Sequence, residues 1–188
     1  MFKSKIKIVL DIIVVIVIFI GAFWLGKIAQ QNIQIQIEVA RFGYFGIFIV
    51  ALVTGFNLAV PIPAISFLPA FVASGLNLYL AILIITAGET IADMVTYFIG
   101  AAGRGLFEKA AKSKITKRLD ALRQSHPLLP IIGLFLWASL VPVPNEVLVG
   151  PLGFLKYRAY AIFLTVGSGN LVFNILYAQG VIKLFSVI

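Results

Sequence analysis

The string VPIP at residues 60–63 recurs as VPVP at residues 141–144, and each copy interrupts a long apolar stretch. Proline removes a backbone hydrogen-bond donor and clashes with the preceding helical turn, so paired prolines break a helix. Inside a membrane, a broken helix persists only where protein or a water-filled cavity covers its free backbone groups. Two Pro-interrupted apolar segments in corresponding positions of two halves therefore indicate a transporter, with its binding region between them.

The composition is that of an integral membrane protein. The chain has 188 residues, of which 61% are hydrophobic and 12% charged, and its mean hydropathy is +1.08. Ordinary soluble domains are roughly 45–50% apolar. The net charge of +8 is clustered, which indicates membrane topology rather than binding of nucleic acid. With no cysteine and a single histidine, His126, neither a disulfide framework nor a metal or other cofactor site is expected.

The N-terminal region predicts a retained membrane helix. Three lysines in the first seven residues precede an apolar run that extends to Leu25. This run is longer than the core of a signal peptide, about 7–15 residues, and bulky Phe23 and Trp24 stand where cleavage requires small residues. We predict a transmembrane helix over residues 1–29 with the N-terminus in the cytoplasm, and an interfacial linker over residues 30–41.

The middle of the chain predicts a first repeat. Residues 42–88 carry no charge, and a membrane crossing needs about 20 residues, so this run is long enough for two crossings. Prolines and turn-forming residues divide this run near its centre. The predicted first repeat, residues 42–103, has a helix from about residue 42, a re-entrant hairpin at 58–76 broken at Pro61, Pro63 and Pro69, and a transmembrane helix at 78–100.

A basic segment separates this repeat from a second one. Residues 104–126 hold seven basic and two acidic residues, which places them on the cytoplasmic side. The cluster either serves as a topology signal alone or also attracts anionic headgroups. The predicted second repeat, residues 127–188, has a re-entrant hairpin at 127–155 broken at Pro142, Pro144 and Pro151, and a transmembrane helix at 159–182.

Internal similarity supports the division into two repeats. A shift of 81 residues superposes the two proline strings and aligns Gly88 with Gly169. A shift of 80 aligns Tyr97 with Tyr177. With the N-terminus and the basic segment both in the cytoplasm, the first hairpin enters from outside and the second from the cytoplasm. The predicted fold is therefore an all-α polytopic membrane protein with two inverted repeats.

Three carboxylates are candidate proton or headgroup sites. Glu89 and Asp93 lie one turn apart on one face of the predicted 78–100 helix, and Glu146 follows the second proline pair. Acidic residues within a membrane usually face a pathway. Alternatively, the first two lie near the interface or pair with Arg158, and Glu146 caps a half-helix.

Other polar residues suggest further contacts. Asn145, Asn170 and Asn174 can supply neutral hydrogen bonds near the carboxylates, in helix adhesion or in ligand binding. Arg104 and Arg158 are candidate phosphate contacts, because arginine binds phosphate in a bidentate manner. The alternative is ordinary snorkelling of these side chains at the membrane interface.

The segment GETIADMVTYFIGAAG at residues 88–103 resembles the G…D-x-x-x-Y-x-I-G-x-x-G signature of the DedA family, also called the SNARE-associated or VTT-domain family. The stretches VPIPAISFLPAFVASG and VPVPNEVLVGPLGF resemble the paired re-entrant loops of that family. The resemblance covers about residues 42–182. It implies scrambling or flipping of phospholipids or undecaprenyl phosphate, sometimes driven by the proton-motive force, and it places Asp93 at the family's acidic position.

The chain departs from the family pattern in both hairpins. Many members have P-x-P-G-E in the first hairpin, where this chain has Ala64 and Ile65. Many carry arginines around the second proline pair, where this chain has Ser139 and Asn145. The acidic form P-x-P-x-E stands instead in the second half and ends at Glu146. The resemblance therefore implies lipid handling without specifying the lipid.

The resulting hypothesis is a lipid scramblase or flippase of a prokaryotic plasma membrane. Its partners would be membrane lipids, and protons are a candidate coupling ion. The sequence does not decide whether the protein forms a homo-oligomer. An ion-coupled exporter of small cationic compounds is a second hypothesis. A non-transporting scaffold that binds partners through the basic segment is a third. An enzyme is not expected, because the sequence contains no nucleophile–base set, metal cluster or phosphate-binding glycine loop.

Overall fold

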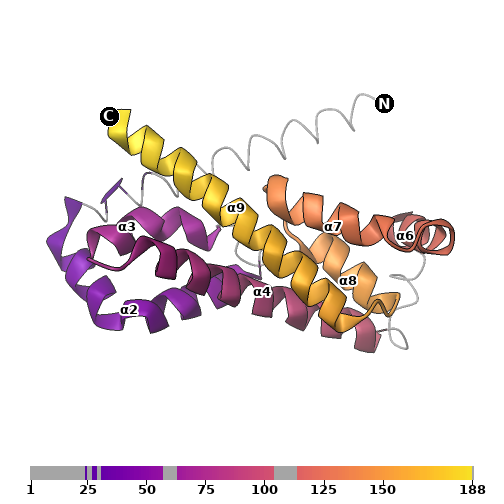
Figure 1. Ribbon diagram of the computed structural model, residues 1–188. Helices are drawn as coiled ribbons and strands as arrows, with labels where there is room; N and C mark the ends of the chain where they lie inside the picture. The colour runs from indigo at the N-terminus through magenta and orange to yellow at the C-terminus, as the bar shows by residue number, and fades with distance from the viewer. Residues whose placement is uncertain (1–23, 25–26, 29–30, 57–62, 104–113, 188) are drawn as a thin grey trace, which may run out of the picture.

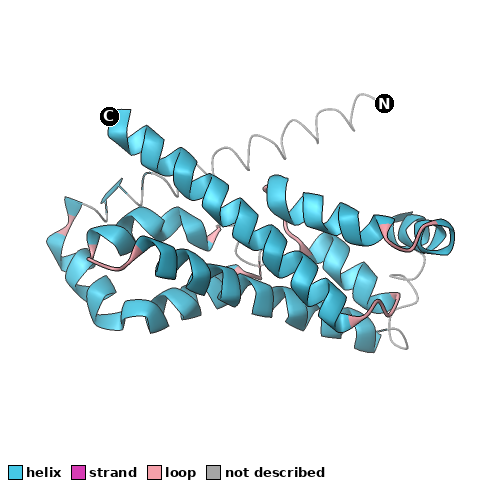
Figure 2. Ribbon diagram, in the orientation of Figure 1, coloured by secondary structure: helices cyan, strands magenta, loops and turns pink. Residues whose placement is uncertain are grey.

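The computed structural model describes residues 24, 27–28, 31–56, 63–103 and 114–187, and these residues form helices without any strand (Figures 1 and 2). Three helices are long and apolar enough to cross a membrane. The all-helical class is therefore confirmed. Most of the predicted helix at residues 1–29, together with Pro61 and Arg104, lies outside the described residues.

The first long helix, α2 (Ile33–Thr54), begins inside the predicted linker at residues 30–41. The side chain of Asn32 accepts hydrogen bonds from the backbone N–H groups of Gln34 at 3.0 Å and Ile35 at 3.3 Å. This cap satisfies two donors that a helix start otherwise leaves free, which explains the early beginning. A kink at Gly43, whose φ is +55°, lies close to the predicted start at residue 42.

A short 3₁₀ helix, η1 (Ala64–Phe67), leads into α3 (Leu68–Ala73), and α4 (Leu78–Ala102) follows. The side chain of Asn77 caps α4 by accepting a hydrogen bond from the N–H of Leu80 at 3.1 Å. The helix α4 matches the predicted transmembrane helix at 78–100 within two residues.

The second half contains α6 (Lys114–Ser125), α7 (Leu129–Leu140), α8 (Glu146–Phe154) and α9 (Ala159–Val187). The helix α7 ends before the second proline pair, where Val141 is extended with φ −106° and ψ 115°. A residue before proline avoids the helical conformation, so the break is local in origin. Within the predicted hairpin at 127–155, the structure has two helices joined by this break.

The turns that precede α4 and α9 have the same backbone structure, 81 residues apart. Gly75 and Lys156 both have positive φ, +84° and +55°. The next N–H group donates to a carbonyl five residues back in each turn: Leu76 to Phe71 at 3.2 Å, and Tyr157 to Leu152 at 3.1 Å. This is the Schellman arrangement that ends a helix. The internal similarity of the sequence thus extends to local structure.

The contacts of α4 with α2 and of α9 with α7 also correspond. A Cβ atom added to Gly88 would lie 2.7 Å from the Cβ of Ala51, and one added to Gly169 would lie 2.5 Å from that of Ala138. The carbonyl oxygens of Phe48 and Phe135, three residues earlier, border the same two glycines. In membranes, such small residues permit the close packing that replaces the hydrophobic effect between helices.

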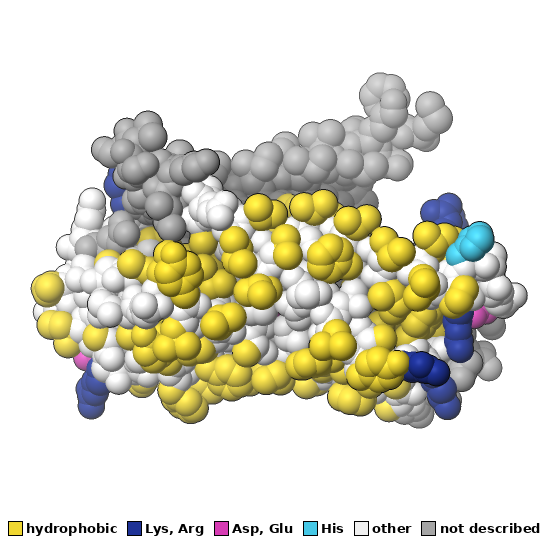
Figure 3. All heavy atoms as spheres, in the orientation of Figure 1, with side chains coloured by type: hydrophobic (Ala, Val, Ile, Leu, Met, Phe, Trp, Pro, Cys, Tyr) yellow, Lys and Arg dark blue, Asp and Glu magenta, His cyan; other side chains and the backbone are white. Residues whose placement is uncertain are grey.

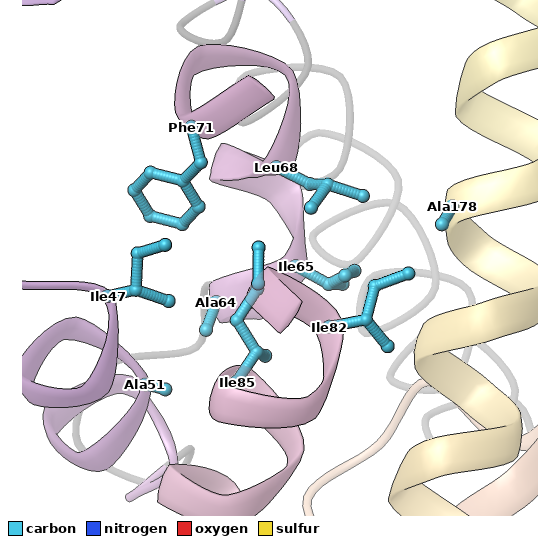
Figure 4. Packing of buried hydrophobic residues seen from close by; sticks show 10 residues of the cluster. Ile47, Ala51, Ala64, Ile65, Leu68, Phe71, Ile82, Ile85 and Ala178 are labelled. Atoms are coloured by element: carbon cyan, nitrogen blue, oxygen red, sulfur yellow. The ribbon is translucent and has the colours of Figure 1, made fainter. Parts of the chain in front are cut away.

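Each half has its own apolar core, and α4 and α9 run antiparallel through both (Figure 1). The first core gathers Ile47 of α2, Ile65 of η1 and Phe71 of α3 against α4, and Ala178 of α9 closes it (Figure 4). The second core is built from α4, α7, α8 and α9 around Leu134, Val149 and Val166. The outer surface is largely apolar, as expected for contact with lipid tails (Figure 3).

The packing of α8 on α4 gives a test of the fold. A Cβ atom on Gly100 would meet the backbone carbonyl of Gly150, which cannot move aside as a side chain can. Gly100→Ala is expected to lower the melting temperature in detergent by several degrees, because overpacking costs about 1–3 kcal/mol and each kcal/mol corresponds to about 2–4 °C.

Gly133→Ala is the matched control, because a Cβ atom there meets nothing within 4 Å. Alanine has the higher helix propensity, by about 1 kcal/mol, so this variant should be neutral or slightly stabilising. Equal melting temperatures for the two variants would contradict the close α4–α8 contact.

Candidate functional site

A polar cluster lies between α4 and α9, near the middle of two helices that are long enough to span a membrane. On α4, Thr86, Glu89 and Asp93 recur at the three- and four-residue spacing of one helix face. On α9, Asn170 and Asn174 lie one turn apart. The structure therefore brings together two of the predicted carboxylates and two of the predicted amides.

Glu89 is hydrogen-bonded by the amide of Asn174. The Asn174 Nδ2 donates to Glu89 Oε2 at 2.8 Å and to Thr86 Oγ1 at 3.1 Å. The Thr86 hydroxyl donates in turn to the carbonyl of Ile82 at 2.9 Å, which orients it as an acceptor. Asn174 has no exposed surface, and its Oδ1 has no hydrogen-bond partner among the described residues.

Asp93 receives two amide donors from different parts of the chain. Asn170 Nδ2 donates to Asp93 Oδ2 at 2.9 Å, and Asn145 Nδ2 donates to the same oxygen at 3.1 Å. Asn145 Nδ2 also donates to Asn170 Oδ1 at 2.8 Å, so the three side chains form a closed triangle. Asp93 is 2% exposed. Because Asn145 lies in the break between α7 and α8, this triangle ties the break to the centre of α4.

The two carboxylate–amide contacts are reciprocal with respect to the 81-residue shift. Under this shift Glu89 corresponds to Asn170, and Asp93 corresponds to Asn174. Glu89 bonds to the counterpart of Asp93, and Asp93 bonds to the counterpart of Glu89. Contacts of i with j and of j with i are the signature of a two-fold interface. The α4–α9 crossing has this pattern, with acids on α4 and amides at the corresponding positions of α9.

Glu146 approaches the same cluster from α8. It is the first residue of that helix, directly after its N-cap Asn145, and it is buried. Its carboxylate is near enough to act electrostatically on Asp93. A carboxylate in the first helical turn is favoured by the helix dipole, but the described residues show no side-chain capping hydrogen bond at the start of α8, so the capping alternative for Glu146 stays a prediction. The described residues nevertheless bring together no group of three or more acidic, histidine or cysteine side chains suited to a metal ion.

Except for Pro151, which lies inside α8, each described proline lies at or near a helix end or a break. Pro63 precedes η1, Pro69 lies in the first turn of α3, Pro142 and Pro144 lie in the α7–α8 break, and Pro151 lies within α8. Proline in a first helical turn loses no hydrogen bond. The η1 segment reaches α9, where the Tyr177 hydroxyl donates to Ser66 Oγ at 3.4 Å.

Arg158 lies apart from the polar cluster. Its guanidinium donates to the Tyr160 hydroxyl at 3.1 Å, and both side chains are exposed. Asn170 is twelve residues further along the chain, about 18 Å of helix. The alternative that Arg158 pairs with Glu89 or Asp93 is wrong, because within the described ranges the one ion pair joins Arg41 to Glu38.

Sequence reasoning named every carboxylate and amide of the cluster but did not foresee the cross-pairing between them. It also missed Thr86 and the Ser66–Tyr177 contact. The signal for the cross-pairing was present, because the shift that aligns the proline strings also aligns the acid pair of α4 with the amide pair of α9.

Comparison of the whole chain with models of protein families, with curated proteins and with solved structures finds no match.

Proposed function

We propose that this chain is a membrane transporter of the lipid scramblase or flippase type, which moves a phospholipid or a similar amphipathic anion between leaflets. The observation that carries the proposal is the cluster of buried and half-buried carboxylates and amides at mid-depth of α4 and α9, built from both halves and joined to the α7–α8 break. Buried ionisable groups at this depth are costly, and they persist where they line a substrate or ion pathway.

The proposal includes an inverted-repeat architecture with two re-entrant hairpins. Three correspondences at the 81-residue shift support it: the two Schellman turns, the glycine contacts of α4 and α9, and the reciprocal carboxylate–amide bonds. Transporters of this kind place their sites where broken helices of the two halves meet at the midplane. On this proposal α7 and α8 enter from the cytoplasmic side, and α2, η1 and α3 approach from the outer side.

The two acids of α4 have different roles in the proposal. Asp93 accepts hydrogen bonds from two amide N–H groups, those of Asn145 and Asn170. These two amides are also hydrogen-bonded to each other. The partner of Glu89, Asn174, keeps a buried carbonyl oxygen to which no described residue donates a hydrogen bond. A rotated Asn174 amide would accept a hydrogen bond from a protonated Glu89. We therefore assign proton exchange to Glu89 and an anchoring role to Asp93.

Lipid as the substrate class rests on the resemblance to the DedA family and on the apolar outer surface, which lets tails remain in the bilayer while a headgroup passes. An ion-coupled exporter of small cationic compounds is the second candidate, because the interior cluster is acidic and the described part of it contains no basic side chain. Such an exporter would show substrate-stimulated proton flux that Glu89→Gln removes.

Reconstitution of the full chain into liposomes with labelled lipids tests the function. The protein should accelerate exchange of lipid between leaflets, and an imposed pH gradient should change the rate. Glu89→Gln is expected to abolish the response to the gradient. Asp93→Asn is expected to reduce exchange at least tenfold under all conditions, because the triangle loses its charged acceptor.

Glu38→Gln is the matched control, since Glu38 is an exposed carboxylate in the first turns of α2. It should leave both the rate and the response unchanged. A rate of lipid exchange no higher than in protein-free liposomes, in several lipid mixtures, would contradict the proposal. A scaffold function would instead be indicated if both Glu89→Gln and Asp93→Asn retained cellular function and only neutralisation of the basic segment removed it.

Cysteine labelling tests the inverted topology in this cysteine-free chain. Tyr79 and Tyr160 occupy equivalent positions in the first turns of α4 and α9, and both are exposed. An impermeant maleimide should label Tyr79→Cys from outside intact cells and Tyr160→Cys only after the membrane is opened. Labelling of both from the same side would rule out the inverted arrangement.

A further inference from the structure

One end of the molecule carries a concentration of basic side chains (Figure 3). We call this the basic surface and define it by the exposed side chains Lys114, Lys117, Arg118, Lys156 and Arg158. The first three lie at i, i+3 and i+4 on α6 and therefore share one helix face. The last two lie in the turn between α8 and α9. The surface thus combines the basic helix with the start of a spanning helix.

The helix α6 is fixed to the rest of the fold by its opposite face. Arg123 donates a hydrogen bond to the carbonyl of Leu155, and its guanidinium lies 5.4 Å from the centre of the Tyr157 ring. Thr116 is buried, and Leu119 packs against the second core. These contacts hold the basic face outward in a defined orientation.

The single acid of α6 lies on the fixed side of the helix. Asp120 is half-buried and lies close enough to Tyr157 to affect it. Burial raises the pKa of the Tyr157 hydroxyl, the guanidinium of Arg123 opposes this, and the carboxylate of Asp120 adds to it. The outward face of α6 therefore presents three cations and no carboxylate.

The charges of the basic surface have no counter-ions within the described protein. Among the described residues the one ion pair joins Arg41 to Glu38 at 3.9 Å, within α2. Leu122 of α6 is exposed, and so are Leu128 and Leu129, which follow α6 at the start of α7; Leu128 is 70% exposed. Cations bordered by exposed leucines make an amphipathic surface of the kind that lies at the headgroup level of a bilayer.

We propose that the basic surface binds the headgroups of anionic lipids in the adjacent leaflet. The location agrees with this occupant, because α4 ends at Ala102 and α9 begins at Ala159, so both spans reach the membrane boundary at this end. Headgroup phosphates would supply the missing counter-charges, and the exposed leucines would contact the upper parts of the tails. The inference concerns binding at the surface and does not rest on lipid translocation.

The test uses the full chain with Ala121→Cys, an exposed position on α6, labelled with an environment-sensitive fluorophore in neutral detergent micelles. Phosphatidylglycerol should change the fluorescence at a lower mole fraction than phosphatidylcholine does, and high salt should remove the difference. Neutralising two charges in Lys117→Gln/Arg118→Gln should weaken phosphatidylglycerol binding roughly 30-fold, since each basic residue near an anionic surface contributes about a factor of five.

Two controls distinguish charge from structural damage. The exchange Lys117→Arg/Arg118→Lys keeps both charges and should keep the affinity. The pair Lys27→Gln/Arg41→Gln removes two charges outside the basic surface and should change the affinity less than twofold. Equal affinity for the two lipids would overturn the proposal, as would an equal loss in the Lys27/Arg41 pair. Unchanged phosphatidylglycerol affinity in the Lys117→Gln/Arg118→Gln variant would overturn it too.

Discussion

The structure depends on hydrogen bonds between α4 and α9, from amides to the buried carboxylate of Asp93 and the half-buried carboxylate of Glu89. A charged carboxylate in a low-dielectric interior is costly unless hydrogen-bond donors reach its oxygens. Glu89 and Asp93 are both engaged by side chains of the opposite helix, 2.8 Å and 2.9 Å away. These bonds fix the register of the crossing, because a slip of one helix turn would leave one acid and one amide without partners.

The glycines of α4 and α9 make this crossing compatible with the rest of the fold. Each helix has to approach its crossing partner and also a helix of its own half, α2 or α7. Gly88 and Gly169 allow the contact with α2 or α7 without separating α4 from α9. The glycine contact between α4 and α8 brings Glu146 and Asn145 to the cluster. Close packing at the glycines therefore sets the positions of the polar residues in the cluster.

The sequence was sufficient for the helical class, the positions of α4 and α9, and the identity of the polar residues. Uncharged runs and paired prolines are local signals, and the observed helices follow them. The start of α2 was misplaced because the alternation at residues 32–37 suggested a linker, whereas the Asn32 cap favours helix. The pairing of acids with amides was not predicted. The 81-residue shift aligns the acid pair of α4 with the amide pair of α9, but which acid meets which amide depends on how the two distant helices cross, and that comes from the structure.

The reciprocal pairing has an evolutionary consequence if the two halves arose by duplication. Identical halves that carried the acids would have placed acid against acid at both contacts, so four carboxylates would have met in the interior. Replacement of the acids by Asn170 and Asn174 in one copy leaves two carboxylates with two donors. Divergence at these positions would then have been a condition for a stable fused chain, and later change at Glu89 or Asp93 would be coupled to change at its partner in the other half.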